Sequence, residues 1–371
     1  MGKELTEKNA LDLVKNYCFD DLSVQDIFSG FLEEEGLLKF APDQNLQIDP
    51  RDNTTVLFNS ARAKRPHDNK LISDFNVKKT EAACPICEGN TTQIVDMAKL
   101  SRGFTFINKN LFPVFYPFPG SEVEEGHKTG KPYGIHFLQW TSSVHDNDWH
   151  NMKMEDLLIV ITRLAELEKK LLFQSGTIMP NSSRWNNKKE TFGFVSIIKN
   201  YGKQVGGSLM HGHQQISFSN TISGQQYNNW KFYQENQCYF TEYLMKNTPE
   251  NLVIKDYGAS VLVVPYFMKR PYNCILAMKN VSRQFLCELD NSELLSVCQA
   301  WSDVTKLFLE IMPEIDRDSA FNILIHNGPG AGLYLEFLPY TQETGGYEQI
   351  GLWICQADPV YTAEQMRNKI N

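Results

Sequence analysis

The sequence of 371 residues lacks a long apolar run, a basic excess and a dense set of cysteines. A membrane-spanning helix needs about 18 or more consecutive apolar residues, and no stretch approaches that length, so we expect no membrane partner. Acidic residues outnumber basic ones by 44 to 36, which argues against a nucleic-acid partner. The N-terminus also lacks the charged and apolar regions of a signal peptide. We therefore predict a cytoplasmic protein.

The eight cysteines are scattered, and only Cys84 and Cys87 lie close together in the sequence. Single dispersed cysteines are typical of a reducing compartment. The two-residue spacing of Cys84 and Cys87 lets both thiolates bind one Zn²⁺, which needs two further ligands to complete a tetrahedral site. Because no second such pair exists, histidines are the candidates for the other ligands. A redox-active dithiol is the alternative interpretation.

The order of apolar segments predicts an α+β fold made of two similar halves with antiparallel sheets flanked by helices. In each half, two strands are followed by a helix and two more strands, and the short spacing between strands favours antiparallel pairing. The first half has predicted strands near 105–117, 134–142, 192–199 and 209–219 and a helix near 154–173. The second half has predicted strands near 258–267, 273–279, 320–326 and 333–339, a helix near 292–311, a further strand at 351–356 and a terminal helix.

Three domains follow from this pattern. Helical periodicity in the first 50 residues predicts a helical N-terminal extension over 1–55, to which the pattern assigns no role. A catalytic domain with the zinc site is expected over 56–240 and a second domain over 241–371. A single larger α+β domain is the main alternative.

The most informative segment is 206–218, which reads Gly-Gly-Ser-Leu-Met-His-Gly-His-Gln-Gln-Ile-Ser-Phe. Side chains alternate along a strand, so His211, His213 and Gln215 are expected to point to one face. Ile216 and Phe218 would then point to the other face. Two imidazoles and a carboxamide on one wall favour a chemical role, and an exposed polar edge strand is the alternative.

A glycine-rich turn precedes this strand. Gly206 and Gly207 have no Cβ that would keep backbone N–H groups away from an anion, so the turn suits a phosphate. Placed directly before the two imidazoles, it predicts a phosphate loop beside a nucleophile. A short basic string at 62–65, Arg-Ala-Lys-Arg, is also suited to one or two phosphates.

Together these motifs resemble galactose-1-phosphate uridylyltransferase and its relatives, a branch of the histidine triad superfamily that transfers nucleotides through a covalent histidine intermediate. The resemblance runs from about residue 58 to the C-terminus. It rests on Gly-x-Ser-x-x-His-x-His-x-Gln at 206–215, Cys-Pro-x-Cys at 84–87 and the arginine string at 62–66. It implies duplicated histidine-triad-like units, a bound zinc ion and a homodimer whose active sites borrow residues from the neighbouring subunit.

The resemblance also implies roles for individual residues. His213 would be the nucleophile, with Gln215 and Ser208 as catalytic groups at the phosphoryl oxygens. His145 or, as the weaker alternative, His150 would complete the zinc site. The full implied sets are Arg62, Arg65, Asn110, Asn200, Gly206 and Gly207 for the nucleotide and its phosphates, Gly346, Tyr347 and Glu348 for the sugar, and Cys84, Cys87, His145 and His211 for the zinc ion.

The chain departs from the family pattern at three places. Leu111 stands where the family has an aspartate after Asn110, and Gln342 stands in place of a lysine four residues before Gly346. The segment 333–338, Leu-Tyr-Leu-Glu-Phe-Leu, lies where many relatives carry a second His-x-His metal pair, so we expect that second site to be absent.

The predicted function is that of a nucleotidyltransferase acting on a nucleoside-diphosphate sugar, in the first instance UDP-glucose, with a sugar 1-phosphate as acceptor. A neutral imidazole, with its usual pKa of about 6.5, presents a nitrogen lone pair at neutral pH and needs no separate base. The alternative is a phosphorylase that uses orthophosphate to cleave ADP-glucose, a GDP-sugar or a dinucleoside polyphosphate. A third hypothesis is a non-catalytic nucleotide-sensing protein.

Overall fold

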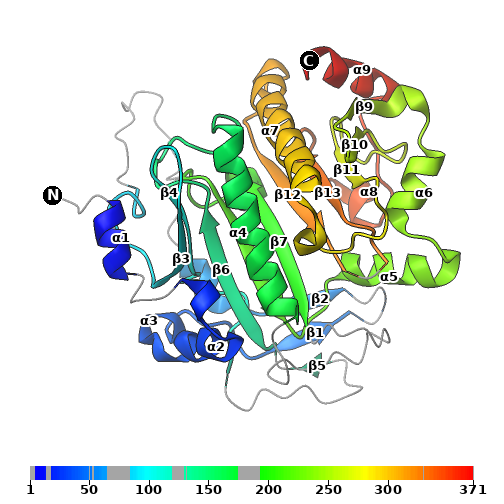
Figure 1. Cartoon of the computed structure of the whole chain (residues 1–371). Coiled ribbons are helices and arrows are strands. Elements are labelled where there is room, and N and C mark those ends of the chain that lie inside the picture. The colour runs from blue at the N-terminus through cyan, green and yellow to red at the C-terminus, as the bar shows by residue number, and fades with distance from the viewer. Residues whose placement is uncertain are drawn as a thin grey trace, which may run out of the picture. The chain divides into compact units, whose positions relative to one another are not determined.

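The computed structural model describes residues 5–13, 18–49, 51, 54–64, 84–118, 129–130, 132–173, 193–328 and 330–370 (Figure 1). Contacts divide the chain into two units. The first comprises Met1–Asp148, Thr162–Ile197 and Ser208–Tyr227, and the second comprises Trp149–Ile161, Ile198–Gly207 and Asn228–Asn371. None of the helices in the described ranges is long and apolar enough to span a membrane. The domain boundaries drawn from the sequence stay predictions.

The first unit is built on an antiparallel sheet with the strand order β3-β4-β6-β8, followed by β7. Its strands are β3 (Ile94–Lys99), β4 (Phe104–Lys109), β6 (Gly134–Trp140), β7 (Phe194–Tyr201, whose second half lies in the second unit) and β8 (His213–Ser219). A small sheet with the order β2-β1-β5 joins β1 (Leu46–Ile48), β2 (Thr55–Leu57) and β5 (Thr129–Gly130).

The second unit repeats this strand order. Its strands are β9 (Val253–Asp256), β10 (Ser260–Val263), β11 (Cys274–Met278), β12 (Phe321–His326) and β13 (Tyr334–Pro339), arranged as β12-β13-β11-β10-β9. If the five strands of each unit are numbered along the chain, both sheets have the order one, two, three, five, four. In both, a long helix follows the third strand. The predicted duplicated α+β architecture is confirmed.

The two long helices begin and end close to their predicted limits. Helix α4 spans Met154–Phe173, and α7 spans Asn291–Glu314. Helix α7 begins after Asp290, whose carboxylate accepts hydrogen bonds from the first free backbone N–H groups of the helix. It packs against β10 and β11, and Trp301 on its buried face stacks on Trp149 with ring centroids 4.0 Å apart.

The N-terminal extension is helical, as predicted, and is part of the first unit. It contains α1 (Glu7–Leu13), α2 (Val24–Glu33) and α3 (Glu35–Leu38). Phe31 of α2 is fully buried and packs edge-on against Phe137 of β6, with centroids 5.1 Å apart. Arg163 of α4 forms an ion pair with Asp20 at 3.0 Å. These contacts hold the extension against the sheet that carries the candidate site.

The predicted strand at 351–356 is wrong, because this segment has no strand partner. The remaining helices of the second unit are α5 (Gly224–Asn236, which begins in the first unit), α6 (Phe240–Asn247), α8 (Gly346–Gln349) and α9 (Pro359–Lys369). Gly351, with φ of 87°, terminates α8, and the Leu352 N–H donates back to the Tyr347 carbonyl at 2.9 Å. The apolar side chains of Leu352 and Ile354 remain more than half exposed, at 58% and 53%.

Candidate active site

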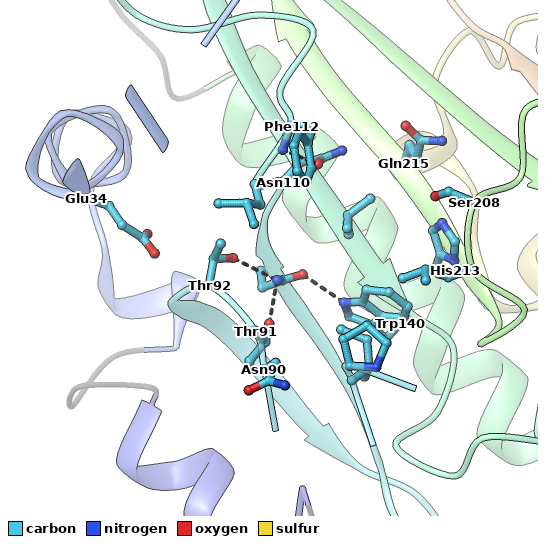
Figure 2. A pocket seen from close by; sticks show the side chains of 16 residues that line it. Glu34, Asn90, Thr91, Thr92, Asn110, Phe112, Trp140, Ser208, His213 and Gln215 are labelled. Carbon is cyan, nitrogen blue, oxygen red and sulfur yellow. Dashed lines mark hydrogen bonds between the residues drawn. The ribbon is translucent and has the colours of Figure 1, made fainter. Parts of the chain in front are cut away.

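Strand β8 places two of the predicted catalytic side chains on the wall of one cavity. The strand begins at His213, four residues after the predicted start at 209. His213 and Gln215 line a cavity of 470 Å³ (Figure 2). Gln214 between them is buried on the opposite side, where its amide donates to Gln139 Oε1 at 2.8 Å. The alternation of a strand therefore presents an imidazole and a carboxamide to the same space.

The backbone sets the tautomer of His213. Its Nδ1 lies 2.8 Å from the carbonyl oxygen of His211. A carbonyl oxygen only accepts hydrogen bonds, so Nδ1 carries the proton and Nε2 of the neutral ring carries the lone pair. The ring also packs against Trp140, with centroids 4.7 Å apart. His213 is thus a buried imidazole in a defined orientation, as a nitrogen nucleophile requires.

A close approach at Gly212 separates the two histidines of the motif. A Cβ at Gly212 would lie 2.5 Å from Cγ of Asp148, so only glycine fits. The Gly212 carbonyl accepts from the Thr141 N–H at 2.9 Å, and the Thr141 hydroxyl donates to Asp148 Oδ1 at 3.0 Å. His211 precedes the strand and is not among the described residues that line the cavity. Its ring instead belongs to a separate cluster.

That cluster consists of Cys84, Cys87, His145 and His211, whose ligand atoms all lie within 4.8 Å of one another. Nδ1 of His211 is 3.6 Å from both cysteine sulfurs, and Nδ1 of His145 is 3.4 Å from the Cys87 sulfur. A tetrahedral zinc site with its usual bond lengths has sulfur–nitrogen edges of about 3.5 Å, so these residues fit a metal ion.

The outer nitrogen of His211 supports this assignment. Nε2 of His211 lies 2.7 Å from the carbonyl oxygen of Ser142, to which it donates. This hydrogen bond leaves Nδ1 as the ligand atom and fixes the plane of the ring, as is usual for histidines that bind metals. The cluster does not include His150. A metal held here would anchor the chain two residues before His213.

The far part of the cavity is lined by neutral polar and apolar side chains. Asn108 accepts from Nε1 of Trp140 at 2.8 Å and donates to the hydroxyl of Thr91 at 2.6 Å. Asn110 accepts from the Phe112 N–H at 2.9 Å. The described lining comprises Glu34, Pro85, Ile86, Asn90, Thr91, Thr92, Asn108, Asn110, Leu111, Phe112, Leu138, Trp140, Ser208, Leu209, His213 and Gln215. Its size and mixed polarity suit a small-molecule ligand.

Comparison with known proteins places this fold and motif. No family model matches the chain. ADP-glucose phosphorylase of Arabidopsis thaliana is 24% identical over 342 residues, which cover 85% of this chain and 89% of that protein. A solved uridylyltransferase has a TM-score of 0.66 at 16% identity and covers 88% of this chain and 98% of its own.

The chain therefore shares the uridylyltransferase fold, and it is similar in sequence to ADP-glucose phosphorylase. A crystal structure of the Arabidopsis thaliana ADP-glucose phosphorylase with bound ADP-glucose also has this fold, with a TM-score of 0.59 at 17% identity over 88% of this chain and 99% of that chain.

Two of the remaining residues implied by the resemblance, Ser208 and Arg62, lie in or beside the cavity wall. Ser208 lines the cavity with His213. Arg62 is not in the lining, but its guanidinium donates to the carbonyl of the lining residue Phe112 at 2.6 Å. Arg65 lies outside the described residues.

The other implied phosphate-loop residues belong to the second unit. Asn200 accepts from the Asn322 amide at 2.7 Å, and the Gly207 N–H donates to the Gly202 carbonyl at 2.9 Å. Gly206 has φ of 87°, a left-handed conformation that favours glycine. The implied sugar residues Gly346, Tyr347 and Glu348 form α8 and are not part of the cavity lining.

Sequence reasoning missed one residue of the cavity lining. Glu34 comes from the helical extension, to which the pattern assigned no role, and it lies at the junction of α2 and α3. An acidic residue at the end of an amphipathic helix looks like ordinary surface charge in the sequence. Only the folded chain brings it to the cavity.

Proposed function

We propose that this chain transfers the nucleoside monophosphate of a nucleotide sugar to a phosphate-bearing acceptor through a covalent intermediate on His213. The observation that carries the proposal is the buried His213 ring. Its Nδ1 is bound to the His211 carbonyl, and the ring lines a cavity of 470 Å³ together with Gln215 and Ser208. An imidazole held in this way presents the Nε2 lone pair as a nucleophile toward phosphorus without first losing a proton.

In the first step, the Nε2 lone pair of His213 attacks the α-phosphorus of the donor. The bond from that phosphorus to the bridging oxygen breaks, and the sugar 1-phosphate departs with the bond electrons. In the second step, an oxygen of the acceptor attacks the same phosphorus, and the phosphorus–nitrogen bond breaks. The His213 ring is returned unchanged, so two displacements give one complete turnover.

The surrounding groups would stabilise the charge that develops on the phosphoryl oxygens. The Gln215 amide and the Ser208 hydroxyl are neutral donors in the cavity wall. The Arg62 guanidinium, which donates to the Phe112 carbonyl, is the nearby cationic group that we assign to the phosphates. A zinc ion held by the cluster of two cysteines and two histidines would have a structural role. Ser142 and the cluster together would orient the segment that leads into β8.

The first candidate substrate pair is ADP-glucose and orthophosphate, which would give ADP and glucose 1-phosphate. The sequence relationship to ADP-glucose phosphorylase over 85% of the chain supports it. The replacement of the family's lysine by Gln342 also supports this pair. The Gln342 amide donates to the Ile354 carbonyl at 2.6 Å and accepts from the Gln356 N–H at 3.1 Å, so both ends of the amide are engaged within the fold.

The second candidate is uridylyl transfer from UDP-glucose to a hexose 1-phosphate. It is supported by the Gly346-Tyr347-Glu348 segment, which resembles the sugar-binding segment of the uridylyltransferases and is exposed, with Tyr347 at 62%. GDP-sugars and dinucleoside polyphosphates remain further donors to test.

A homodimer is part of the proposal. Five large apolar side chains are exposed over a short stretch, with Tyr347 at 62%, Ile350 at 72%, Leu352 at 58%, Trp353 at 39% and Ile354 at 53%. Exposed apolar side chains gathered in one segment are typical of a protein interface. A second copy of the chain that covers it would complete the sugar end of the site. The cytoplasmic location stays a prediction from cysteine usage.

Intact-protein mass spectrometry tests the proposal directly. The wild-type chain and the His213→Ala variant are incubated briefly with ADP-glucose, UDP-glucose and a GDP-sugar in separate reactions. A mass increase of one nucleoside monophosphate in the wild type alone would support the mechanism and identify the base. Release of that nucleotide by orthophosphate or by hexose 1-phosphate then separates the two candidates. The absence of an adduct with every donor would favour a non-catalytic nucleotide-sensing protein.

A further inference from the structure

The charge inventory of the cavity contains one unusual residue. Among the described residues that line it, Glu34 is the one acidic side chain, and no lysine or arginine is present. Carboxylates and phosphates repel each other, so a carboxylate does not belong at the phosphate end of a nucleotide site. Its value to such a ligand lies in accepting hydrogen bonds from N–H or O–H groups.

Contacts within the first unit hold Glu34 in place. Its Oε1 accepts from the backbone N–H of Gln93 at 3.2 Å, and its Oε2 lies 3.1 Å from Nζ of Lys109. The Lys109 ammonium is fully buried and also donates to the Gly30 carbonyl and to Gln93. Each carboxylate oxygen has two acceptor positions, so these contacts orient the group and leave acceptor capacity for a ligand.

Glu34 and His213 lie on opposite sides of the cavity (Figure 2). Figure 2 also shows Thr92 and Asn110 between them. In a nucleotide whose α-phosphorus is at His213, the ribose is bonded directly to that phosphate and must stay close to it. The base is the part that extends farthest from the phosphorus. The end of the cavity at Glu34 is therefore the base end.

We propose that Glu34 selects the base by accepting a hydrogen bond from its exocyclic amino group, and that the site therefore prefers adenine to a base with a carbonyl at the same position. This inference rests on the proposed function, because it takes His213 as the point that fixes the phosphate. A carboxylate accepts from an amino group and faces lone-pair repulsion from a carbonyl oxygen, so it discriminates in both directions.

The inference gives the N-terminal extension a function. Glu34 lies between α2 and α3, and Phe31 and the Gly30 carbonyl fix the end of α2 against the sheet. The helices thus carry a specificity group to a cavity whose other described walls come from later parts of the first unit.

The test compares two donors that differ at one position of the purine. ADP-glucose carries an amino group at C6, and inosine diphosphate glucose carries a carbonyl there. The rate of nucleotidyl-histidine formation is measured by mass spectrometry for both donors in wild type, Glu34→Gln and Glu35→Gln. A hydrogen bond to a charged group corresponds to a preference of about tenfold or more, which is what we expect for adenine in the wild type.

The Glu34→Gln variant should abolish that preference, because a carboxamide accepts from the amino group and donates to the carbonyl equally well. Lys109 keeps its contacts to Gly30 and Gln93, so the variant is expected to fold, which a melting curve checks. Glu35→Gln is the matched control. It removes the same charge from the adjacent exposed residue, which does not line the cavity, and it should leave the preference unchanged.

Three outcomes would overturn the inference while leaving the proposed function intact. Equal rates with both donors in the wild type would show that no group reads C6. A wild-type preference that survives in Glu34→Gln would assign the selection to another residue. If Glu34 instead held a ribose hydroxyl, the variant would slow both donors alike, which also overturns it. Failure of every donor to form an adduct would instead contradict the proposed function.

Discussion

The two units share one strand order but differ in what their fifth strand presents. In the first unit, β8 begins with His213 and places His213 and Gln215 on the wall of a cavity. In the second unit, β13 begins with Tyr334, whose hydroxyl donates to Asn229 at 3.2 Å. Two residues on, the Glu336 carboxylate is hydrogen-bonded to Nε2 of His326 at 3.0 Å.

This difference indicates that the fold provides the position for a site and that the side chains decide whether chemistry occurs there. The polar groups of the second unit's fifth strand are paired with protein groups, so they stabilise the sheet. The equivalent groups of the first unit face a space that a ligand can fill. In the proposed function, the chemistry therefore depends on the side chains of the first unit and not on the fold itself.

The largest difference should come from substituting the first residue of β8 and the first residue of β13. We expect His213→Ala to lower kcat for ADP-glucose phosphorolysis by about 10⁴-fold or more, since removal of a covalent nucleophile eliminates the two-step route. Tyr334→Phe, at the equivalent strand position, should leave kcat close to that of the wild type. Steady-state assays with melting curves as a check on folding measure both, and comparable losses in the two variants would contradict the comparison.

The cysteines of the two units should also differ. Cys87→Ser removes a ligand of the cluster, so we expect loss of bound metal and a melting temperature lower by about 10 °C, since structural metal sites contribute directly to folding. Cys298 in α7 is fully buried, and burial raises the pKa of its thiol, which therefore stays protonated and is a poor metal ligand. Cys298→Ala should keep the metal, as elemental analysis of the purified protein would show. Equal metal content in both variants would refute the assignment.

Much of the fold follows from apolar periodicity, and the misses have physical reasons. Helix α4 was predicted with its observed limits, because it carries a regular apolar stripe. Strand β3 was missed because its alternation is broken by Asp96, a buried carboxylate that Arg163 contacts at 2.7 Å. Helix α5 was missed because it is polar on nearly all sides. The partner of Asp96, Arg163, is distant in sequence, so a local pattern does not reveal it.

The candidate site divides in the same way. The residues of the His-x-His-x-Gln motif and the cysteine pair were found because their spacing within one strand or turn carries the signal. Glu34 could not be found, because its role depends on how α2 packs against β6 through Phe31 and Phe137. The start of β8 was predicted four residues too early, so His211 precedes the strand and lies in the cluster with Cys84, Cys87 and His145.

A smaller effect is expected from the glycines that precede the two strands. A Cβ at Gly212 would meet Asp148 at 2.5 Å, and a Cβ at Gly332 would meet the Thr241 hydroxyl at 2.2 Å. Each Gly→Ala change should therefore cost about 1–3 kcal/mol of unfolding free energy. Gly212→Ala should also lower kcat by about 10²-fold, because it displaces His213. Denaturant titrations measure the loss of stability, and kinetics measure the loss of kcat. An equal loss of kcat in Gly332→Ala would contradict the assignment of the chemistry to the first unit.

The smallest effect concerns the hydrogen-bonded pair of His326 in β12 and Glu336 in β13. Burial raises the pKa of Glu336, but the hydrogen bond and charge of His326 outweigh it, so the pKa of Glu336 lies below its ordinary value of 4.5. A group with a lowered folded-state pKa stabilises the protein above its unfolded pKa and loses that contribution as the pH falls through the folded one.

Glu336→Gln should therefore lower the free energy of unfolding by about 1 kcal/mol at pH 7, and the difference from the wild type should shrink as the pH falls below about 4.5. Urea titrations from pH 7 to pH 3 measure this difference. Its kcat for ADP-glucose should stay at the wild-type value, because Glu336 belongs to the copy that stabilises. A fall in kcat without a fall in stability would mean that the second unit shares in the chemistry, and the division between the two copies would no longer hold.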